Sequence, residues 1–267
     1  MSEPTRSIVY KSIGPVELRI HVFTGDAETG DNAGRTRASR PTSAIVFFHG
    51  GGWRGGTPAQ FYPHCEHLAR RGMVAMSAEY RLKDIHQTTP VESVEDAKSA
   101  IRWIRSHAEE LGIDPARLAA GGGSAGGHLA AACGLISDTN SSDDDRSISA
   151  TPDALVLFNP VLDTSPSVLE RDLLPDRWQE LSPLEHVRAG APPTLVMVGT
   201  EDRFLPVATA SAFAEKMASA GVRCELRLYD GQQHGFFNYF EGKDEYYTRT
   251  VGEMESFLES LGLLAAR

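Results

Sequence analysis

A serine flanked by glycines is the residue of this sequence whose setting most clearly suggests chemistry. Ser124 lies in GGSAG, a GxSxG motif; a strand-like apolar run, residues 118–122, leads into it, and a helical pattern, residues 125–136, follows. A serine on a sharp strand-to-helix turn can project its hydroxyl as a nucleophile, and the glycines avoid collisions of any Cβ with nearby backbone. The helix behind it offers unpaired N–H groups and a positive dipole end to a developing oxyanion. We therefore predict that Ser124 is a nucleophile and that the N–H of Ala125 is an oxyanion donor.

A run of glycines after an earlier strand could complete the same oxyanion site. The sequence HGGGW, residues 49–53, directly follows the apolar run 44–48. Glycine backbones can present N–H groups to a substrate oxygen without interference from side chains, and one such donor in a studied enzyme contributes about 2.7–4 kcal/mol to lowering the barrier. We expect Gly51 and Gly52 to supply two further donors, and Trp53 to line the substrate pocket beside them.

A nucleophilic serine needs a base, and the base needs a carboxylate that fixes its tautomer. Asp202 follows the strand-like run 194–198, and His234 follows the next one, residues 225–229. Of the nine histidines, His234 is the one that follows both a late strand and a suitably placed acid. The chain order of nucleophile, acid and histidine is typical of one class of strand-turn-helix serine enzymes. We predict Ser124, Asp202 and His234 as a catalytic triad.

Other acidic residues could take the place of Asp202. Glu201 is its neighbour, and Asp163 follows the earlier strand-like run 155–158. A carboxylate at the end of the strand that immediately precedes the histidine can reach its ring most easily. Asp202 therefore remains the preferred acid. Glu79 is expected to be a structural carboxylate near the cleft.

The remaining histidines near these motifs are expected to have supporting roles. His49 is expected to brace the glycine loop, and His128 to pack one turn into the helix behind Ser124. His64 and His67 are three residues apart on a predicted helix, but no third ligand accompanies them. We therefore expect no metal site.

A dinucleotide site is the main alternative interpretation of the glycine-rich turn. Gly121, Gly123 and Gly126 also spell GxGxxG between a strand and a helix. The acidic residue expected about 20 residues later, at the end of a following strand, is missing, because the acidic cluster 138–145 lies in a polar loop. That interpretation would also leave the HGGG run unexplained, so we expect no cofactor.

Apolar runs of strand length alternate with helical patterns along most of the chain. Strands are expected at residues 44–48, 73–78, 118–122, 155–158, 194–198 and 225–229, and helices at 60–70, 91–111, 125–136, 208–220 and 246–261. Continuous apolar strands that alternate with helices indicate a mostly parallel sheet covered on both faces. The alternating segment 8–22, with Gly-Pro at its centre, predicts an antiparallel hairpin in front of it. The expected fold class is a three-layer α/β fold.

The chain is expected to form a single domain over residues 1–267. A polar, glycine-rich stretch, residues 24–41, lacks periodicity and predicts a flexible loop. Residues 164–190 interrupt the alternation of strands and helices and carry three prolines. We expect this second segment to form a small cap above the sheet.

Composition restricts the classes of partner. Of the 267 residues, 41% are hydrophobic and 23% are charged, as in an ordinary globular protein, and the formal net charge is −10. A nucleic-acid binder would usually show a basic stripe, and an anionic membrane would repel this chain. Three widely spaced cysteines and the absence of an apolar N-terminal region favour reduced thiols and a cytoplasmic location. The oligomeric state stays open.

Taken together, the motifs HGGGW, GGSAGGHLA, GTEDRFLP and QQHGFF resemble those of the α/β-hydrolase superfamily. Within it, the chain is similar to hormone-sensitive-lipase-type esterases and to acetyl-xylan/feruloyl esterase-like hydrolases, from about residue 44 to the C-terminus. The resemblance implies the α/β-hydrolase fold and the same triad and oxyanion glycines. The chain departs from the first group at Gly123, where those relatives commonly carry Asp, and in its short cap. Both departures favour the small, open-cleft esterases.

The resemblance implies a serine carboxylic-ester hydrolase that acts through an acyl-enzyme and needs no cofactor. Its substrates would be small short-chain acyl esters, with acetyl or feruloyl esters of sugars among the candidates. Two alternatives stay open: an amide hydrolase of the kynurenine-formamidase type, and a non-catalytic binding protein on the same scaffold. Loss of a triad member would mark the second alternative, and this sequence retains all three.

Overall fold

The computed structural model describes residues 3–25, 41–166 and 177–266. Most of the expected loop 24–41 and the middle of the expected cap 164–190 lie outside these ranges. Within them, eight strands form one sheet in the order β1-β2-β4-β3-β5-β6-β7-β8. The strands are β1 (Arg6–Ile13), β2 (Val16–Phe23), β3 (Thr42–Phe48), β4 (Val74–Ala78), β5 (Ile113–Gly123), β6 (Ala154–Phe158), β7 (Thr194–Gly199) and β8 (Cys224–Tyr229).

The direction of the strands agrees with the sequence pattern. The hairpin β1–β2 is antiparallel, and β2 also pairs antiparallel with β4, whereas each neighbouring pair from β4 to β8 is parallel. The carboxyl ends of the six parallel strands therefore meet at one edge of the sheet, where ligands of open α/β sheets bind. The expected three-layer fold with an N-terminal antiparallel hairpin is confirmed.

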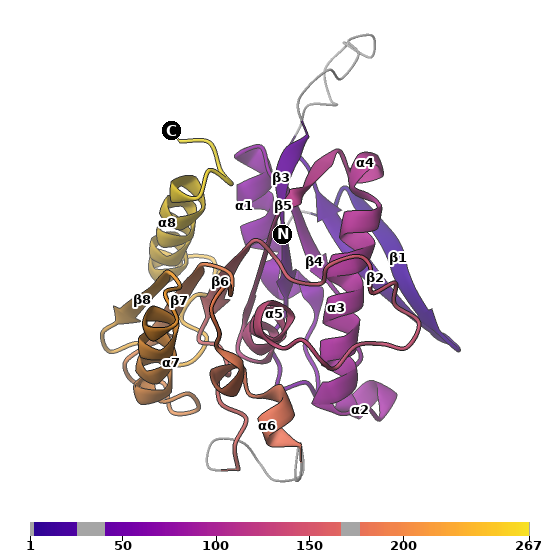
Figure 1. The fold of residues 1–267 in the computed structure, drawn as a ribbon. Coiled ribbons are helices and arrows are strands. Elements are labelled where there is room, and N and C mark those ends of the chain that lie inside the picture. The colour runs from indigo at the N-terminus through magenta and orange to yellow at the C-terminus, as the bar shows by residue number, and fades with distance from the viewer. Residues whose placement is uncertain (1–2, 26–40, 167–176, 267) are drawn as a thin grey trace.

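Helices cover both faces of the sheet (Figure 1). Apolar side chains of α3 (Pro90–Ser106), α5 (Ala125–Leu135) and α7 (Val207–Ser219) belong to the core cluster on one face. Those of α1 (Tyr62–Arg70) and α8 (Glu245–Ser260) belong to the cluster on the other face. The remaining helical elements of the described residues are short: η1 (Pro58–Phe61), α2 (Lys83–His86), α4 (Ala108–Leu111), α6 (Trp178–Leu181) and η2 (Pro183–His186).

The long helix expected at residues 91–111 is two helices in the structure. α3 begins with a capping box, in which the Thr89 side chain accepts the N–H of Val91 and the Glu92 side chain accepts the N–H of Thr89. It ends at Ser106, and α4 begins two residues later. His107 adopts non-helical torsions between them. Its ring stacks on Trp103, a local contact that the apolar periodicity did not reveal.

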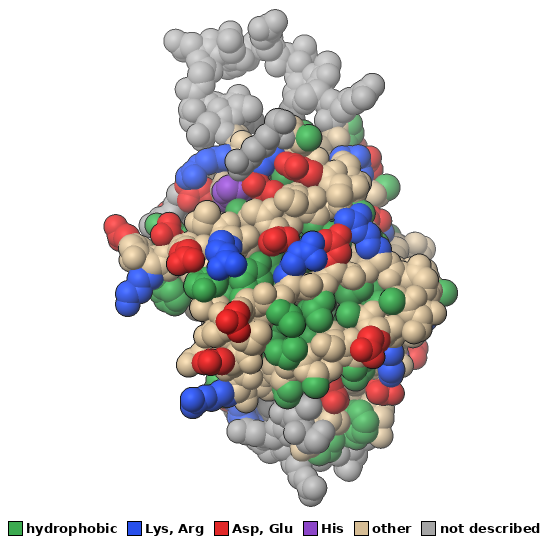
Figure 2. Space-filling model, turned by 90° about the vertical axis from the view of Figure 1, so that its left-hand side faces the viewer, with side chains coloured by type: hydrophobic (Ala, Val, Ile, Leu, Met, Phe, Trp, Pro, Cys, Tyr) green, Lys and Arg blue, Asp and Glu red, His purple; other side chains and the backbone are tan. Residues whose placement is uncertain are grey.

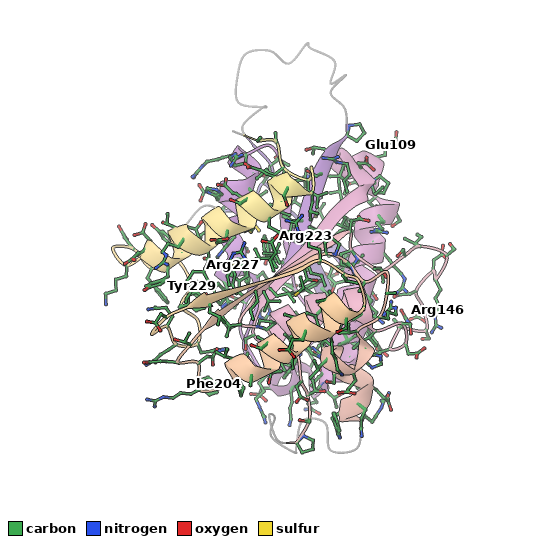
Figure 3. All side chains as sticks on the ribbon, turned by 60° about the vertical axis from the view of Figure 1, so that its left-hand side comes forward. Glu109, Arg146, Phe204, Arg223, Arg227 and Tyr229 are labelled. Carbon is green, nitrogen blue, oxygen red and sulfur yellow. The ribbon has the colours of Figure 1, made fainter. Side chains whose placement is uncertain are left out.

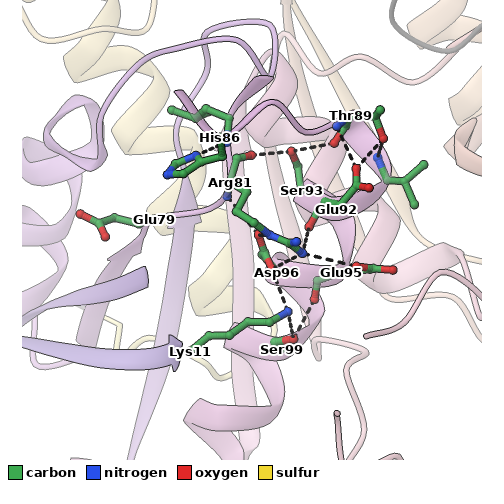
Figure 4. Close-up of polar contacts among 12 residues, drawn as sticks. Lys11, Glu79, Arg81, His86, Thr89, Glu92, Ser93, Glu95, Asp96 and Ser99 are labelled. Carbon is green, nitrogen blue, oxygen red and sulfur yellow. Dashed lines mark hydrogen bonds and ion pairs between the residues drawn. The ribbon is translucent and has the colours of Figure 1, made fainter. Parts of the chain in front are cut away.

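A buried carboxylate anchors the N-terminal hairpin and the end of β4 to α3. Asp96 on α3 accepts a hydrogen bond from Lys11 of β1 at 2.8 Å and one from Arg81 Nε at 2.7 Å (Figure 4). The backbone N–H of Arg81 donates to the same carboxylate at 3.0 Å, and the carbonyl of Arg81 accepts the Ser93 hydroxyl. Because both cations and a backbone amide satisfy this carboxylate, its burial does not leave an uncompensated charge. The segment after β4 is thereby held beside α3.

One end of the sheet is formed by β8, whose outer edge pairs with no other described strand. Arg227 lies on β8 and Arg223 directly precedes it (Figure 3), and Arg227 Nε lies 2.9 Å from the Glu253 carboxylate of α8. Apolar side chains gather on this side of the molecule among charged ones (Figure 2), and Leu228 is 49% exposed. Charged side chains on an edge strand discourage its pairing with another chain.

None of the described helices combines the length and the apolar character needed to cross a membrane.

Candidate active site

Ser124 lies on the sharp turn between β5 and α5. Its φ of 55° and ψ of −119° are values that a residue with a side chain rarely adopts. Its N–H donates to the carbonyl of Phe158 at 3.0 Å, and its own carbonyl accepts the N–H groups of His128 at 3.0 Å and Val161 at 3.2 Å. These hydrogen bonds hold the strained peptide from both sides. The Ser124 side chain is partly exposed.

Two glycines of the motif are required by close backbone contacts. A Cβ on Gly122 would lie 2.5 Å from the backbone carbon of Gly126. A Cβ on Gly126 would lie 1.9 Å from the carbonyl oxygen of Phe48. Side chains at either position would collide with backbone that cannot move without opening the sheet. The strand-turn-helix interpretation of the motif is therefore supported by the packing.

The glycine at position 123, where hormone-sensitive-lipase-type esterases commonly carry Asp, is explained by packing in this chain. A Cβ on Gly123 would lie 2.4 Å from Cζ of Phe237. Phe237 is buried and belongs to the loop that carries His234. The aromatic ring fills the space that a side chain at position 123 would need. In this chain the histidine loop packs directly on the serine turn.

The glycine loop lies beside Ser124 and keeps donors free. A Cβ on Gly50 would lie 3.4 Å from the Cβ of Ser124, so the two segments are in contact. Gly51 and Gly52 have φ values of 122° and 62°. Within the described ranges, neither of their N–H groups has a hydrogen-bond acceptor. Ala125 is the first residue of α5, so its N–H has no intrahelical partner either.

Asp202 and His234 lie together at the carboxyl edge of the sheet. His234 Nδ1 is 2.8 Å from Asp202 Oδ2, and Asp202 Oδ1 accepts the N–H groups of Phe204 at 2.9 Å and Leu205 at 3.0 Å. Burial alone would raise the pKa of Asp202, but the hydrogen bonds from His234 and the two amides outweigh it, and the pKa is lowered. An ionised Asp202 requires a proton on Nδ1 of His234. The other ring nitrogen, Nε2, is then free to accept a proton.

The two alternative acids are directed elsewhere. Asp163 Oδ1 accepts the backbone N–H of Ser165 at 2.8 Å, which closes a local turn. Glu201 is exposed, and its backbone N–H donates to the carbonyl of Gln232. Among the described contacts, neither carboxylate reaches His234. Glu79 accepts the N–H of Arg19 at 2.9 Å, as a structural carboxylate would.

Two further histidines support the site from within the core. The His49 ring stacks on Tyr80, whose hydroxyl donates to the carbonyl of His49 at 2.8 Å. Burial lowers the pKa of His49 to about 4, although its hydrogen bond to Gly50 opposes this. His128 Nε2 is 2.7 Å from the carbonyl of Leu181, and burial lowers its pKa to about 4 as well. Both are neutral at physiological pH and brace neighbouring segments.

Trp53, which we expected to line the substrate pocket, has little exposed surface. The side chain is 2% exposed and packs edge-to-face on His128, with ring centroids 5.0 Å apart. Trp53 has a φ of 58°, a left-handed conformation that sequence patterns do not reveal. The indole belongs to the core cluster that also contains apolar side chains of α3 and α5.

Three side chains that the sequence did not single out complete the site. Gln60 Oε1 accepts the N–H of Gly50 at 2.6 Å, and Gln60 Nε2 donates to Asn238 Oδ1 at 3.0 Å, which joins the glycine loop to the histidine loop. Asn159, directly after β6, contacts the ring of His234. Phe204 lies at the surface (Figure 3), where it is 70% exposed. Its ring meets the His234 ring edge-to-face, with centroids 5.2 Å apart. The position of Asn159 at a strand end was the one signal available.

Comparison with known proteins agrees with this architecture. A family described as having the alpha/beta hydrolase fold matches residues 45–238. The chain belongs to the α/β-hydrolase family. It is 30% identical over 220 residues to Esterase LipC of Mycobacterium tuberculosis, covering 74% of this chain and 54% of that protein. It is also 30% identical to the Carboxylic ester hydrolase LipN of the same organism, covering 88% of this chain and 69% of that one.

The chain spans about half the length of LipC and of the Probable carboxylic ester hydrolase LipM from the same organism, 54% and 45%. Solved structures match over nearly the whole chain. Thermogutta terrifontis esterase 2 phosphonylated by cyclosarin superimposes with a TM-score of 0.91 and 43% identity, covering 100% of this chain and 98% of that one. The propionate-bound form has a TM-score of 0.89 and 43% identity over 98% and 96%. The resemblance to α/β-hydrolase esterases is thus confirmed.

Proposed function

We propose that this α/β-hydrolase is a serine carboxylic-ester hydrolase with Ser124 as nucleophile, His234 as base and Asp202 as the acid that orients the base. The observation that carries the proposal is the 2.8 Å contact between His234 and Asp202. It lies at the strand ends where the strained Ser124 turn is also found. An ionised carboxylate with a neutral imidazole beside a serine turn is the arrangement that activates a hydroxyl.

The reaction has two halves that share one base. Ser124 Oγ attacks the ester carbonyl carbon while its proton passes to His234 Nε2, and the carbonyl oxygen becomes an oxyanion. The N–H groups of Gly51, Gly52 and Ala125 bind that oxyanion. The tetrahedral intermediate expels the alcohol, which takes the proton from Nε2, and an acyl-enzyme remains. Water then repeats the attack through the same histidine and releases the carboxylic acid and Ser124.

The relatives support both the reaction and the size of the substrate. Several are named as esterases or carboxylic ester hydrolases, and solved structures of the Thermogutta esterase carry organophosphorus groups, propionate or butyrate. Short-chain acyl esters are therefore the proposed substrates, with acetyl or feruloyl esters of sugars as candidates that the resemblance to acetyl-xylan/feruloyl esterase-like hydrolases implies. The three free cysteines fit a reducing, cytoplasmic compartment.

The nucleophile is tested by Ser124→Ala. We expect kcat to fall by about 10⁶, because the nucleophile and base act as a unit, while the melting temperature changes little. Paraoxon should label the wild-type protein once, on Ser124, as shown by mass spectrometry of peptides. Ser211→Ala, on α7 away from the site, is the matched control and should keep both activity and labelling. Labelling of another residue, or substantial turnover by Ser124→Ala, would refute the assignment.

The acyl group is tested with 4-nitrophenyl acetate, butyrate, octanoate and decanoate. Each additional buried CH₂ contributes about 0.8 kcal/mol, roughly fourfold in kcat/KM, as long as the pocket has room. We expect the maximum at acetate or butyrate, with micelle formation checked for the long chains. A maximum at octanoate or beyond contradicts the short-acyl proposal. Sugar acetates, feruloyl esters and formanilides belong in the same panel, and faster turnover of formanilides would identify an amide hydrolase.

A further inference from the structure

Asn159 occupies an unusual position beside the proposed base. It directly follows β6, is 0% exposed and has a φ of +33°, although it precedes a proline. Residues with a side chain rarely adopt this φ, and a following proline restricts the backbone further. Its N–H donates to the carbonyl of Met197 at 2.7 Å. The sheet therefore holds Asn159 in a conformation that it would not adopt alone.

The side chain of Asn159 lies over the face of the His234 ring. Its Nδ2 is 3.2 Å from Nδ1 and 3.3 Å from Nε2 of His234. These two nitrogens flank a single ring carbon, Cε1. An atom equally close to both cannot lie in the ring plane, because it would collide with that carbon and its hydrogen. The amide therefore makes an N–H contact with the π face of the imidazole.

This contact is the one polar interaction that the amide makes with the described residues. Asn159 Oδ1 is buried and has no hydrogen-bond partner among them. Buried polar atoms without partners are uncommon, and they often mark a functional constraint. Asn159 thus combines a strained backbone with an unpaired buried oxygen. Its amide nitrogen nevertheless remains in contact with the face of the imidazole.

Two contacts are needed to define the orientation of an imidazole. The Asp202 hydrogen bond fixes the position of Nδ1 but lets the ring tilt about that point. An amide on one face removes the tilt and so sets the direction of Nε2. The positive N–H edge of the amide also disfavours a positive charge on the ring. Of the described groups that contact this ring, Asp202 is charged, whereas Asn159 and Phe204 are not.

We propose that Asn159 is a positioning residue that sets the plane of the His234 ring and keeps that ring neutral before substrate binds. The inference rests on the proposed function, because it takes His234 as the base. In this role, the amide of a strained, buried residue helps to set the direction of Nε2. The amide touches neither substrate nor Ser124 Oγ in this role.

The decisive variants are Asn159→Gly and Asn159→Asp. Glycine adopts positive φ freely, so Asn159→Gly removes the amide without adding backbone strain. We expect kcat to fall about 10- to 100-fold with little change in KM. The fall of kcat/KM on the acid side of its pH profile, the acid limb, should also move to higher pH, because the amide no longer disfavours a positive charge on the ring. Asn159→Asp places a carboxylate over the ring and should move the limb further, by about 1–3 pH units.

Thr139→Gly is the matched control, because Thr139 also has a positive φ, of 59°, but lies in the loop after α5. It should behave like the wild type, and melting temperatures of all variants report on folding. The inference is overturned if Asn159→Gly keeps the wild-type kcat and pH profile. It is equally overturned if both Asn159 variants lose activity without moving the acid limb, which indicates a purely structural role.

His234→Ala separates this inference from the proposed function. If that variant is inactive while Asn159→Gly is normal, only the role of Asn159 is refuted. If His234→Ala keeps substantial turnover, the base is misassigned and both proposals are refuted.

Discussion

Strained backbone is concentrated at the residues around the serine. Trp53, Ser124 and Asn159 all have positive φ, and they come from three different strand ends. Each such residue costs on the order of 1–3 kcal/mol, which the surrounding packing must offset. The other two described non-glycine residues with positive φ, Gln87 and Thr139, lie in turns away from these strand ends. Hydrogen bonds from the sheet hold the strained peptides of Ser124 and Asn159 in place.

Replacing Asp202 by Asn tests the acid. An amide can donate to Nδ1 and would favour the wrong tautomer of His234, so we expect kcat to fall about 10⁴-fold, as in a protease triad. The melting temperature should change far less than the activity. Asp163→Asn is the matched control, because its carboxylate closes a local turn and should affect kcat little. A mild effect at Asp202 with a severe one at Asp163 would move the acid to the end of β6.

At the scale of elements, the site is assembled by loops that contact each other above the strand ends. The loop after β8 packs Phe237 on Gly123 of β5, and Gln60 of η1 bridges the loops after β3 and β8. The Asp96 carboxylate holds the segment after β4 through a hydrogen bond from its backbone. Tyr80 in that segment supports the glycine loop. Each loop is thereby positioned by its neighbours as well as by its own strand.

Gly123→Ala tests the contact between the serine turn and the histidine loop. The added methyl would lie 2.4 Å from the Phe237 ring, so the loop with His234 must shift. We expect a loss of about 1–3 kcal/mol in the free energy of unfolding, as for other overpacked cores, and a larger loss in kcat/KM. Denaturant melts and kinetics measure the two effects.

The double variant Gly123→Ala, Phe237→Leu provides the control for that clash. Trimming the ring should restore part of the activity, and the two substitutions should show a coupling energy in a double-mutant cycle. Additive effects in the cycle would show that the methyl group and the ring do not compete for the same space.

Over the whole molecule, buried neutral histidines couple stability to pH. Burial lowers the pKa of His64 to about 3, and those of His49 and His128 to about 4. In the unfolded chain a histidine takes up a proton below about pH 6.5, whereas these folded ones do so only near pH 3–4. The unfolded state therefore binds more protons in this window, and the free energy of unfolding falls as pH decreases through it.

His64→Leu should flatten this dependence. His64 is surrounded by aromatic rings, and neither of its ring nitrogens has a hydrogen-bond partner among the described residues. The variant should be as stable as the wild type or more stable at pH 7, because an unsatisfied polar group is removed. Between pH 7 and pH 5 it should lose ~2 kcal/mol less than the wild type.

The measurement is urea unfolding at several pH values. His107→Leu, at a partly exposed histidine between α3 and α4, is the control for replacing a histidine outside the core. Parallel pH curves for His64→Leu and the wild type would contradict the assignment of a buried neutral imidazole.

By itself the sequence determined the features that depend on local spacing. The alternation of apolar strands with helical patterns predicted the three layers and the parallel sheet. The GGSAG turn, the HGGG run and the strand ends before Asp202 and His234 could be recognised because each is a short segment with a definite backbone requirement. Parallel strands bring their carboxyl ends to one edge, so chain order alone placed Asp202 and His234 near Ser124.

Only the tertiary structure decided which side chains meet across that edge. Asn159 reaches His234 over a separation of 75 residues, and Gln60 reaches Asn238 over 178. The left-handed φ of Trp53 and the packing of its indole on His128 were also not encoded in any periodicity. Such contacts depend on side-chain packing between segments distant in the chain, which residue types and spacing do not specify.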